Sequence, residues 1–289
     1  MKSETPIKYL RSDLRGADRA ISIKLMLGSF GKTISRWSRA FGLDLAAFYT
    51  SVKGLRRFWT NYRRFTELNS AAGRHWKIRP NYPCLHDFDS ASGVARGHYF
   101  HQDLYVAQKI FQKAPIKHVD CGSRIDGFVA HIASFRPIEV LDIRSLPQGI
   151  PNVVFHRCDL LNIPAQFHEY CDSLSCLHVL EHIGLGRYGD PIEIHGHTIA
   201  LGNFATILRP GGTLFLSTPF GAECIEYNAH RIFHLLTILK LIEQSFEVVD
   251  FAMVDDSGEL NERADLQSAV RSSDRYRFAL AIFELRKPG

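Results

Sequence analysis

The stretch Ile116–Gly127, IKHVDCGSRIDG, decides how the larger part of this chain folds. Its first half is an apolar run typical of a buried strand, and Gly122 follows where the chain must turn. The next apolar residues, as far as Phe135, are spaced as in a helix whose N-terminus would face a ligand beyond the strand. The full G-x-G-x-x-G pattern is absent, so this segment alone also fits an ordinary strand-to-helix turn.

Strand-like and helix-like runs alternate from this stretch to the end of the chain. Continuous apolar strands separated by amphipathic helices predict an α/β fold, with a mostly parallel sheet covered by helices on both faces. The last two strands follow each other without an intervening helix-like run, which predicts an antiparallel hairpin at one edge. The helix-like runs are 101–112, 125–135, 196–208 and 231–244, and the strand-like runs are 116–121, 138–143, 152–158, 172–177, 213–218, 246–254 and 278–285.

The segment Arg74–Gly97 is rich in Pro, Gly, Ser and Asp, a composition typical of a connector. We therefore predict two parts, a basic and mainly helical extension with its connector at residues 1–98 and an α/β domain at residues 99–289. Residues 1–80 hold 17 Lys and Arg against 5 Asp and Glu, whereas the remainder holds 18 against 25. This basic, aromatic front segment can contact an anionic membrane surface or pack on the main domain, and we favour packing.

Composition excludes several classes of protein. No apolar run approaches the roughly 18 residues that span a bilayer, and the N-terminal residues lack the apolar core of a secretory signal. The protein is therefore expected in the cytoplasm, with peripheral membrane contact as the alternative. The six cysteines form no C-x-x-C pair, which argues against a disulfide framework and a cysteine zinc site. Nucleic acid is not expected as a partner, because the larger part is net acidic and lacks aromatic-rich recognition motifs.

Acidic residues follow three of the predicted strands. Asp142 lies 22 positions after Asp120, the spacing at which an acid meets ribose hydroxyls in nucleotide-binding sheets. Asp159 follows the third strand, where an adenine amine would lie. Each acid alone also fits a helix cap or a turn. Three acids at neighbouring strand ends together predict a site for an adenosine-bearing cofactor.

These segments resemble the class I S-adenosylmethionine-dependent methyltransferases over Tyr99–Lys287. The matching motifs are VDCGSRIDG, LDI, CDLLNIP, DSLSCLHVLEH and LRPGGTLFLSTP. More narrowly, HYFHQDL, GSRIDGFVAH, LHVLEHIGLGRYGDP and NAHRIF together resemble the DUF268 family. The resemblance implies a Rossmann-like methyltransferase sheet with an antiparallel C-terminal strand, and S-adenosyl-L-methionine as the cofactor.

The resemblance also implies roles for single residues. Asp120 and Gly122 would line the methionine side of the cofactor, Asp142 would bind the ribose, and Asp159 with the next residue would face the adenine. Ser123-Arg124 replaces the usual second glycine, and the guanidinium either meets the cofactor carboxylate or obstructs the pocket. The predicted cofactor site comprises Asp120, Gly122, Ser123, Arg124, Asp142, Ile143, Asp159, Leu160 and His178.

The motif His-Val-Leu-Glu-His at residues 178–182 matches the H-x-x-E-H pattern of inverted zinc peptidases. A zinc helix would need His178 and His182 on one face of a continuous helix, with a third ligand elsewhere. The preceding run reads as a buried strand, and the glycines soon after it oppose a helix. We therefore predict a strand-to-loop junction without a metal. A metal-assisted reaction stays open as an alternative, because further histidines follow at 195, 197, 230 and 234.

Two polar loops follow the fourth and fifth strands. The first, IGLGRYGDPIEIHGH at residues 183–197, combines flexible glycines with donors and acceptors, which favours binding of a polar substrate. It also fits a turn-rich connector with an internal Arg–Asp pair. The second is EYNAHRIF at residues 226–233, in which Asn228 alternatively caps a helix. The predicted substrate-binding residues are Arg187, Tyr188, Asp190, His197, Asn228 and Arg231.

Together the motifs predict methyl transfer from S-adenosylmethionine to an oxygen, or less readily a nitrogen, of a hydroxyl-rich small molecule or glycan. Histidine titrates near neutral pH, so His182 or His230 is predicted as the catalytic base. Two other classes stay open. One is a cofactor-binding module without catalysis, which the incomplete glycine loop permits. The other is a nucleotide-dependent enzyme such as a dinucleotide oxidoreductase, because Asp142 alone does not distinguish adenosine carriers.

Overall fold

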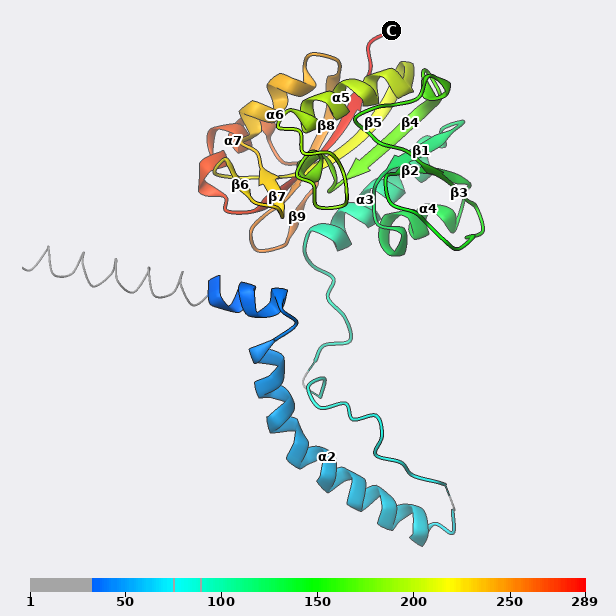
Figure 1. Cartoon of the computed structure of the whole chain (residues 1–289), viewed down its shortest axis with the longest axis vertical. Coiled ribbons are helices and arrows are strands. Elements are labelled where there is room, and N and C mark those ends of the chain that lie inside the picture. Colours follow the sequence, from blue (N-terminus) through cyan, green and yellow to red (C-terminus); the bar gives the residue numbers. More distant parts are fainter. Residues whose placement is uncertain (1–32, 75, 89) are drawn as a thin grey trace, which may run out of the picture. The chain divides into compact units, whose positions relative to one another are not determined.

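The computed structural model describes residues 33–74, 76–88 and 90–289. These residues form two compact units that divide between Gly93 and Val94. The front unit contains a helical stretch at residues 33–40 and the long helix α2, Leu45–Ala71 (Figure 1). Residues 1–32 of the predicted helical extension lie outside the described residues.

Helix α2 begins at Asp44, whose carboxylate accepts hydrogen bonds from the backbone N–H groups of Ala46 and Ala47, both at 3.0 Å. The connector returns along this helix, and its Leu85 carbonyl lies where a side chain at Gly54 would be. The Arg57 guanidinium lies 3.5 Å from the centre of the Phe88 ring. None of the described helices combines the length and the apolarity that a membrane crossing requires.

The second unit is an α/β domain built on one large sheet. Within the described part of the chain this sheet has eight strands in the order β3-β2-β1-β4-β5-β10-β8-β9 (Figure 1). Strands β1 to β5 pair in parallel, and β10 runs antiparallel to both β5 and β8. The strands are β1 His118–Cys121, β2 Ile138–Asp142, β3 Val153–Arg157, β4 Cys171–Leu177, β5 Leu208–Phe220, β8 Glu247–Val254, β9 Leu260–Asn261 and β10 Ala279–Arg286.

Helices cover both faces of the sheet. One buried cluster joins the apolar side chains of α5, α6 and α7 to one face. A second buried cluster joins those of α3, the π-helical turn η1 and α4 to the other face. The predicted fold class, a mostly parallel sheet with an antiparallel C-terminal strand between two helical layers, is confirmed. The helical elements are α3 His98–Lys113, η1 Ile125–Val129, α4 Ala130–Ala133, η2 Ala165–Phe167, η3 Leu180–His182, α5 Gly196–Ile207, α6 Leu235–Ile242, α7 Leu266–Arg271 and η4 Ser273–Arg275.

Two details of the predicted order are wrong. Residues 231–233 do not open a helix, because His230–Ile232 forms β7, which pairs with β6, Cys224–Glu226. Helix α6 begins after His234, whose ring accepts a hydrogen bond from the Leu236 N–H at 3.1 Å and so caps the helix.

The final strands β8 and β10 pair antiparallel as predicted, but they do not form a hairpin at the edge of the sheet. Strand β10 lies between β5 and β8, inside the sheet, and seven of its eight residues are buried. The short helix α7 and β9 lie between β8 and β10 in sequence. Because β10 lies inside the sheet, the apolar residues on both of its faces pack in the two buried clusters that the helices cover. At an edge of the sheet these residues would be more exposed.

Strand order reverses between β1 and β4, because the chain runs outward from β1 through β2 to β3 and then returns to the other side of β1. At such a reversal the connections that follow the two neighbouring strands diverge to opposite sides and leave a crevice. The crevice lies at the C-terminal ends of the strands, which is where the predicted cofactor residues are found.

Candidate functional site

A cavity of about 340 Å³ lies at the carboxyl ends of the strands around this reversal. Its wall includes residues that follow β1, β2, β3 and β4, together with the loop after β4. The structure therefore brings most of the predicted cofactor residues and part of the predicted substrate loop to one place. The predicted residues that line this cavity are Gly122, Arg124, Asp142, Ile143, Asp159, Leu160, His178, His182, Arg187, Tyr188 and Asp190.

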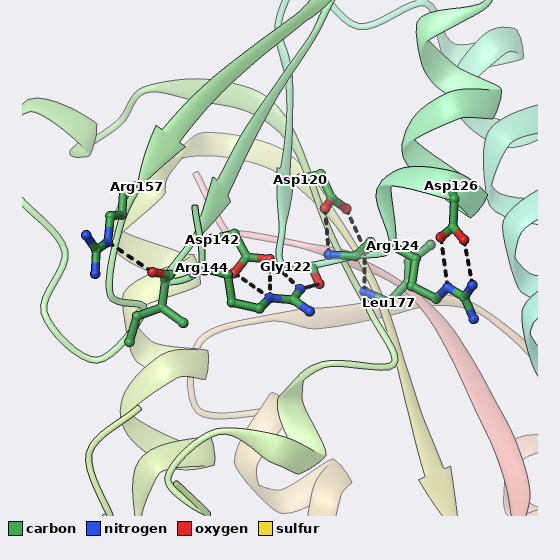
Figure 2. Close-up of polar contacts among 10 residues, drawn as sticks. Asp120, Gly122, Arg124, Asp126, Asp142, Arg144, Arg157 and Leu177 are labelled. Atoms are coloured by element: carbon green, nitrogen blue, oxygen red, sulfur yellow. Dashed lines mark hydrogen bonds and ion pairs between the residues drawn. The ribbon is translucent and has the colours of Figure 1, made fainter. Parts of the chain in front are cut away.

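Gly122 makes the turn after β1. It has φ of +74°, and a Cβ atom there would lie 2.9 Å from the Val179 side chain, so a larger residue is excluded by both conformation and space. Arg124, at the position of the usual second glycine, pairs with Asp126 at 2.8 Å (Figure 2) and is one of the residues that line the cavity. Its side chain is 56% exposed, so it does not fill the cavity.

Asp120 lies beneath the cavity wall and is fully buried. Its carboxylate accepts hydrogen bonds from the Ser123 N–H at 2.9 Å and from the Ser123 hydroxyl at 2.7 Å (Figure 2). It also accepts one from the Ser175 hydroxyl at 2.6 Å. The Ser123 hydroxyl in turn accepts from the Leu177 N–H at 3.3 Å. Asp120 and Ser123 therefore join the glycine turn to β4, and neither side chain lines the cavity.

Burial sets the charge of this buried group of side chains. Desolvation raises the pKa of Asp120 to about 6, although the hydrogen bonds from Ser175 and Ser123 favour its ionised form. The neighbouring His118 is also fully buried, and burial lowers its pKa to about 3. His118 is therefore neutral at pH 7 and shares hydrogen bonds with Ser173 and Ser175.

Asp142 lies at the tip of β2 and is almost fully buried, yet the residue lines the cavity. Arg144 pairs with it through Nε at 3.0 Å and Nη2 at 2.5 Å and also donates its backbone N–H at 2.8 Å (Figure 2). The same guanidinium reaches the Gly122 carbonyl at 3.4 Å and lies 4.8 Å from the centre of the Tyr188 ring. Arg144 thus connects the ends of β1 and β2 with the loop after β4.

Asp159 begins the turn after β3. Its carboxylate accepts a hydrogen bond from the Leu161 N–H at 2.9 Å, as in a turn-capping residue. The Leu160 carbonyl accepts a hydrogen bond from Asn203 of α5 at 2.8 Å, which fixes the turn against that helix. Both Asp159 and Leu160 line the cavity, as predicted.

The His-Val-Leu-Glu-His motif has the predicted strand-to-loop conformation. Strand β4 ends at Leu177, His178 has φ of +59°, and the single 3₁₀ turn η3 follows at Leu180–His182. The His178 N–H donates to the Ser217 hydroxyl at 3.0 Å, which holds the motif on β5. No continuous α-helix carries the two histidines in this part of the described chain.

The tertiary fold nevertheless places the two histidine side chains around one buried carboxylate. His178 Nδ1 hydrogen-bonds to Glu181 Oε1, and His182 Nε2 lies 3.7 Å from the same oxygen. His178 Nε2 lies 3.0 Å from Nδ1 of His98, and His182 Nδ1 donates to the Ala229 carbonyl at 2.6 Å. Burial would raise the pKa of Glu181, but His178 and His182 lower it below its usual value.

The glycine-rich loop at residues 183–197 is held mainly by its own polar groups. The Asp190 carboxylate accepts hydrogen bonds from the N–H groups of Gly184 at 2.7 Å, Gly186 at 3.2 Å and Tyr188 at 3.1 Å. Arg187 donates to the Ala229 carbonyl at 3.0 Å and does not pair with Asp190. Asp190 shapes the loop, and Tyr188 projects toward the cavity edge.

Three predicted substrate-binding residues lie away from this cavity. Arg231 is 4% exposed and donates to the carbonyls of Glu181 at 3.3 Å and Ile183 at 2.7 Å. It therefore holds the start of the loop in place. His197 packs beside Phe233, and burial lowers its pKa to about 4. Asn228 is exposed in the turn between β6 and β7.

A second cavity of about 560 Å³ adjoins the first and shares part of its wall. His230 lines this second cavity, where its ring centre lies 4.7 Å from that of Phe278 with the two rings tilted by 37°. Burial lowers the pKa of His230, so the neutral ring predominates at pH 7. The residues common to both cavities are Tyr99, His178, His182, Arg187 and Tyr188.

Sequence reasoning did not assign several of the lining residues. Arg144 follows the predicted strand-tip motif LDI in sequence. Its position two residues after Asp142 was the only sequence feature that could have indicated a pair with this carboxylate. His98 and Tyr99 begin α3, far from the other site residues in sequence, and only the fold brings their rings against His178. The remaining unassigned residues include Leu177, Val179, Ile183, Arg96, Asp255, Asp256, Arg277 and Phe278.

Comparisons with known proteins place this domain in a family. A family model described as "Caenorhabditis protein of unknown function, DUF268" matches residues 128–287, more than half of the chain. The chain therefore belongs to the DUF268 family, and the resemblance drawn from the sequence is confirmed. No curated protein sequence gives a significant match.

Several solved structures share the general fold. A 1,6-didemethyltoxoflavin-N1-methyltransferase of Burkholderia thailandensis, with bound S-adenosylhomocysteine, is 14% identical, with a TM-score of 0.47 over 65% of this chain and 79% of that chain. The N-methyltransferase NodS of Bradyrhizobium japonicum is 12% identical, with a TM-score of 0.47 over 72% and 94%. The [4+2]-cyclase SpnF is 15% identical, with a TM-score of 0.48 over 80% and 95%. Sequence identities and TM-scores this low do not indicate which reaction this chain catalyses.

The Asp120 hydrogen bonds predict a specific loss of stability. Substitution Asp120→Ala leaves the buried hydroxyls of Ser123 and Ser175 without their acceptor, so the free energy of unfolding should fall by about 1–3 kcal/mol in urea titrations followed by circular dichroism. Asp126→Ala is the matched control, because this exposed carboxylate pairs only at the rim, and its effect should be within about 0.5 kcal/mol. Equal losses in the two variants would contradict the assigned role of Asp120.

Proposed function

We propose that the second unit binds S-adenosylmethionine in the smaller cavity and transfers its methyl group to an acceptor in the larger one. The single observation that carries this proposal is the position of Asp142 and Gly122 on one cavity wall, at the reversal of strand order. Ligands of parallel α/β sheets bind at this position, and the acid at the second strand tip is the usual partner of a ribose. The adjoining cavity provides a separate place for an acceptor.

The residues of the smaller cavity fit the proposed cofactor. Gly122 leaves room for close approach to the backbone, Asp142 supplies a ribose acceptor, and Asp159 with Leu160 forms the wall at the third strand. Arg144 occupies the Asp142 carboxylate, so ribose hydroxyls would have to displace it. Its side chain is 46% exposed, so solvent is accessible to the guanidinium once it leaves the Asp142 carboxylate.

The larger cavity suits a polar acceptor. Its wall carries guanidinium groups, imidazoles and the carboxylates of Asp255 and Asp256, with aromatic surfaces from Tyr99, Tyr188 and Phe278. Polar groups beside aromatic faces can bind the hydroxyls and the apolar faces of a sugar ring. We therefore propose a hydroxyl-rich acceptor, with a sugar or glycan as the leading class and oxygen as the atom that is methylated.

When bound, S-adenosylmethionine supplies an electrophilic methyl group, because the sulfur of its sulfonium leaves with the bonding electron pair. The protein must align the acceptor, exclude water and accept the proton of the acceptor hydroxyl. His230 lines the acceptor cavity, and its ring nitrogens make no hydrogen bond to another described residue. His182 already donates Nδ1–H to Ala229 and is more deeply buried, so we assign the base to His230.

Binding experiments separate this proposal from its rivals. Calorimetric titration of the full chain with S-adenosylmethionine and S-adenosylhomocysteine should give saturable binding, whereas NAD and UDP-glucose should give none. Binding of NAD alone would favour a dinucleotide-dependent enzyme. Binding of S-adenosylmethionine without transfer of labelled methyl to any cell fraction would favour a regulatory module.

The ribose contact can be tested by one substitution. Asp142→Asn should weaken binding of S-adenosylhomocysteine at least about tenfold in calorimetry, because hydrogen bonds to a charged acceptor contribute about 1.5–3 kcal/mol. Asp126→Asn removes a carboxylate that only pairs with Arg124 at the rim and should leave the affinity nearly unchanged. The assignment of Asp142 fails if the two variants bind equally well.

The base can be tested once an acceptor is in hand. His230→Gln should lower kcat by roughly 10²–10⁴-fold, the usual contribution of general base catalysis, without changing the Kd of S-adenosylhomocysteine. His195→Gln is the control, since His195 is exposed and lines neither cavity. An unchanged kcat in the His230 variant would remove this residue from the proposed role.

We further propose that the front unit contacts an anionic lipid surface, with the packing on the main domain that the sequence favours as the alternative. Helix α2 exposes Phe48, Tyr49, Val52 and Trp59, which are spaced on a helical face, and 43–69% of each residue is exposed. Basic residues such as Lys53 accompany them, and aromatic residues with basic residues suit a membrane interface.

Lipid binding would depend on charge. The double variant Arg63→Glu, Arg64→Glu should lower binding to phosphatidylserine vesicles at least about tenfold in co-sedimentation, because each basic residue near such a surface contributes about 1 kcal/mol. The double variant Arg271→Glu, Arg275→Glu makes the same charge change on the second unit and serves as the control. Equal binding of the wild-type chain to neutral phosphatidylcholine vesicles would refute the electrostatic proposal.

A further inference from the structure

The boundary between the two cavities holds a group of ligand-type side chains whose function is not accounted for by methyl transfer alone. His178 and His182 line both cavities, and Glu181 lies buried between them. One ligand atom from each of the three residues lies within 4.8 Å of the other two. The group brings together two imidazole nitrogens and a carboxylate oxygen.

Glu181 is the unusual member of this group. Glu181 is fully buried, and its carboxylate oxygen Oε2 has no hydrogen-bond partner among the described residues. Buried carboxylates are normally paired, hydrogen-bonded through both oxygens or bound to a cation, because an unsatisfied charge in the interior is costly. The arrangement therefore leaves part of this carboxylate available to a positive ion.

His182 presents a second electron pair to the same point. The Ala229 carbonyl can only accept a hydrogen bond, so Nδ1 of His182 carries the proton. In the neutral ring Nε2 then bears a lone pair, and this atom lies 3.7 Å from Glu181 Oε1. Two acceptors that face each other at this distance repel unless a cation lies between them.

The outer contacts of the two histidines match those of metal ligands. A metal-bound imidazole usually donates its other N–H to a carbonyl, a carboxylate or another acceptor, which fixes the ring. His182 does so to Ala229, and His178 has His98 Nδ1 at 3.0 Å from its Nε2. Ser217 also fixes the backbone of His178. Both rings are therefore held in place from outside the group.

We propose that His178, Glu181 and His182 bind one divalent transition-metal ion at the boundary between the cavities. The ion would replace the hydrogen bond between His178 and Glu181 with bonds of about 2.0–2.2 Å to each ligand. Two imidazoles and one carboxylate suit Zn²⁺, Mn²⁺ or Fe²⁺ and leave coordination positions open. His178 and His182 line both cavities, so a ligand bound there would have access to the ion.

The ion would also favour one class of methyl acceptor, namely molecules that can bind the metal through two neighbouring oxygens. Bound at an open position, an acceptor hydroxyl loses its proton more readily, and a neighbouring oxygen of the same molecule can occupy a second position. His230, whose ring lies 6.4 Å from that of His182, remains on the acceptor side to take the proton. The acceptor would therefore carry two adjacent oxygens. This role rests on the proposed function, whereas the ion site does not.

Metal binding is tested on the full chain after treatment with a chelator. Titration with Mn²⁺, followed by the electron paramagnetic resonance signal of the free ion, should show one equivalent bound, and calorimetry with Zn²⁺ should agree. Glu181→Gln and His182→Ala should each weaken the affinity at least about tenfold. His156→Ala is the matched control, because His156 also pairs with a carboxylate, that of Glu139, but lacks a second imidazole. Its affinity should equal that of the wild-type chain.

Folding of the variants is checked by thermal melting and by binding of S-adenosylhomocysteine, and Glu181→Gln preserves the shape of the buried side chain. Absence of Mn²⁺ and Zn²⁺ binding, or unchanged affinity in both ligand variants, would overturn the ion site. A chain that binds one equivalent of metal through these residues but does not bind S-adenosylhomocysteine would refute the proposed function and leave the ion site standing. The opposite result would refute only the ion site.

Discussion

The hydrogen bonds of Asp120 hold together the two strands between which the sheet reverses its order. Without the reversal, the connections after β1 and β4 would not diverge, and no cavity would form at their ends. The Asp120 contacts to Ser123 and Ser175 add to the backbone pairing of β1 with β4 and fix the turn at Gly122 against β4. Gly122 and Leu177, which line the cavity, and the histidine motif that follows Leu177 lie at this junction.

Many polar side chains around the cavities form hydrogen bonds with backbone groups. Asp190 and Arg231 were predicted to bind substrate, yet they bind N–H groups and carbonyls of the loop after β4. Such contacts are expected wherever a glycine-rich loop lies against a sheet, because its buried backbone groups need partners. They also keep Tyr188 and His182 at the boundary between the cavities. Loop stability and ligand access are therefore coupled in this domain.

The boundary between the cavities concentrates imidazoles around one carboxylate. Burial lowers the pKa of His98 to about 4 and that of His182 below its usual value, while Glu181 stays ionised. The interior at this point thus holds a carboxylate beside two imidazoles, those of His98 and His182, whose pKa burial lowers. Such a site attracts a cation, and a sulfonium and a metal ion are both of that kind. The electrostatics of the boundary agree with both proposals.

The sequence by itself determined the fold class, the strand ends that meet at the cavity, and the break after β4, because periodicity and glycine positions are local properties. It did not determine which polar side chains face the cavity, since alternation along a strand does not reveal that Asp120 turns inward to the two serines. The pairing of Arg144 with Asp142, the approach of His98 to His178, and the insertion of β10 between β5 and β8 were decided only by the tertiary structure. Each depends on contacts between segments or on side-chain direction, and these follow from packing of the whole domain.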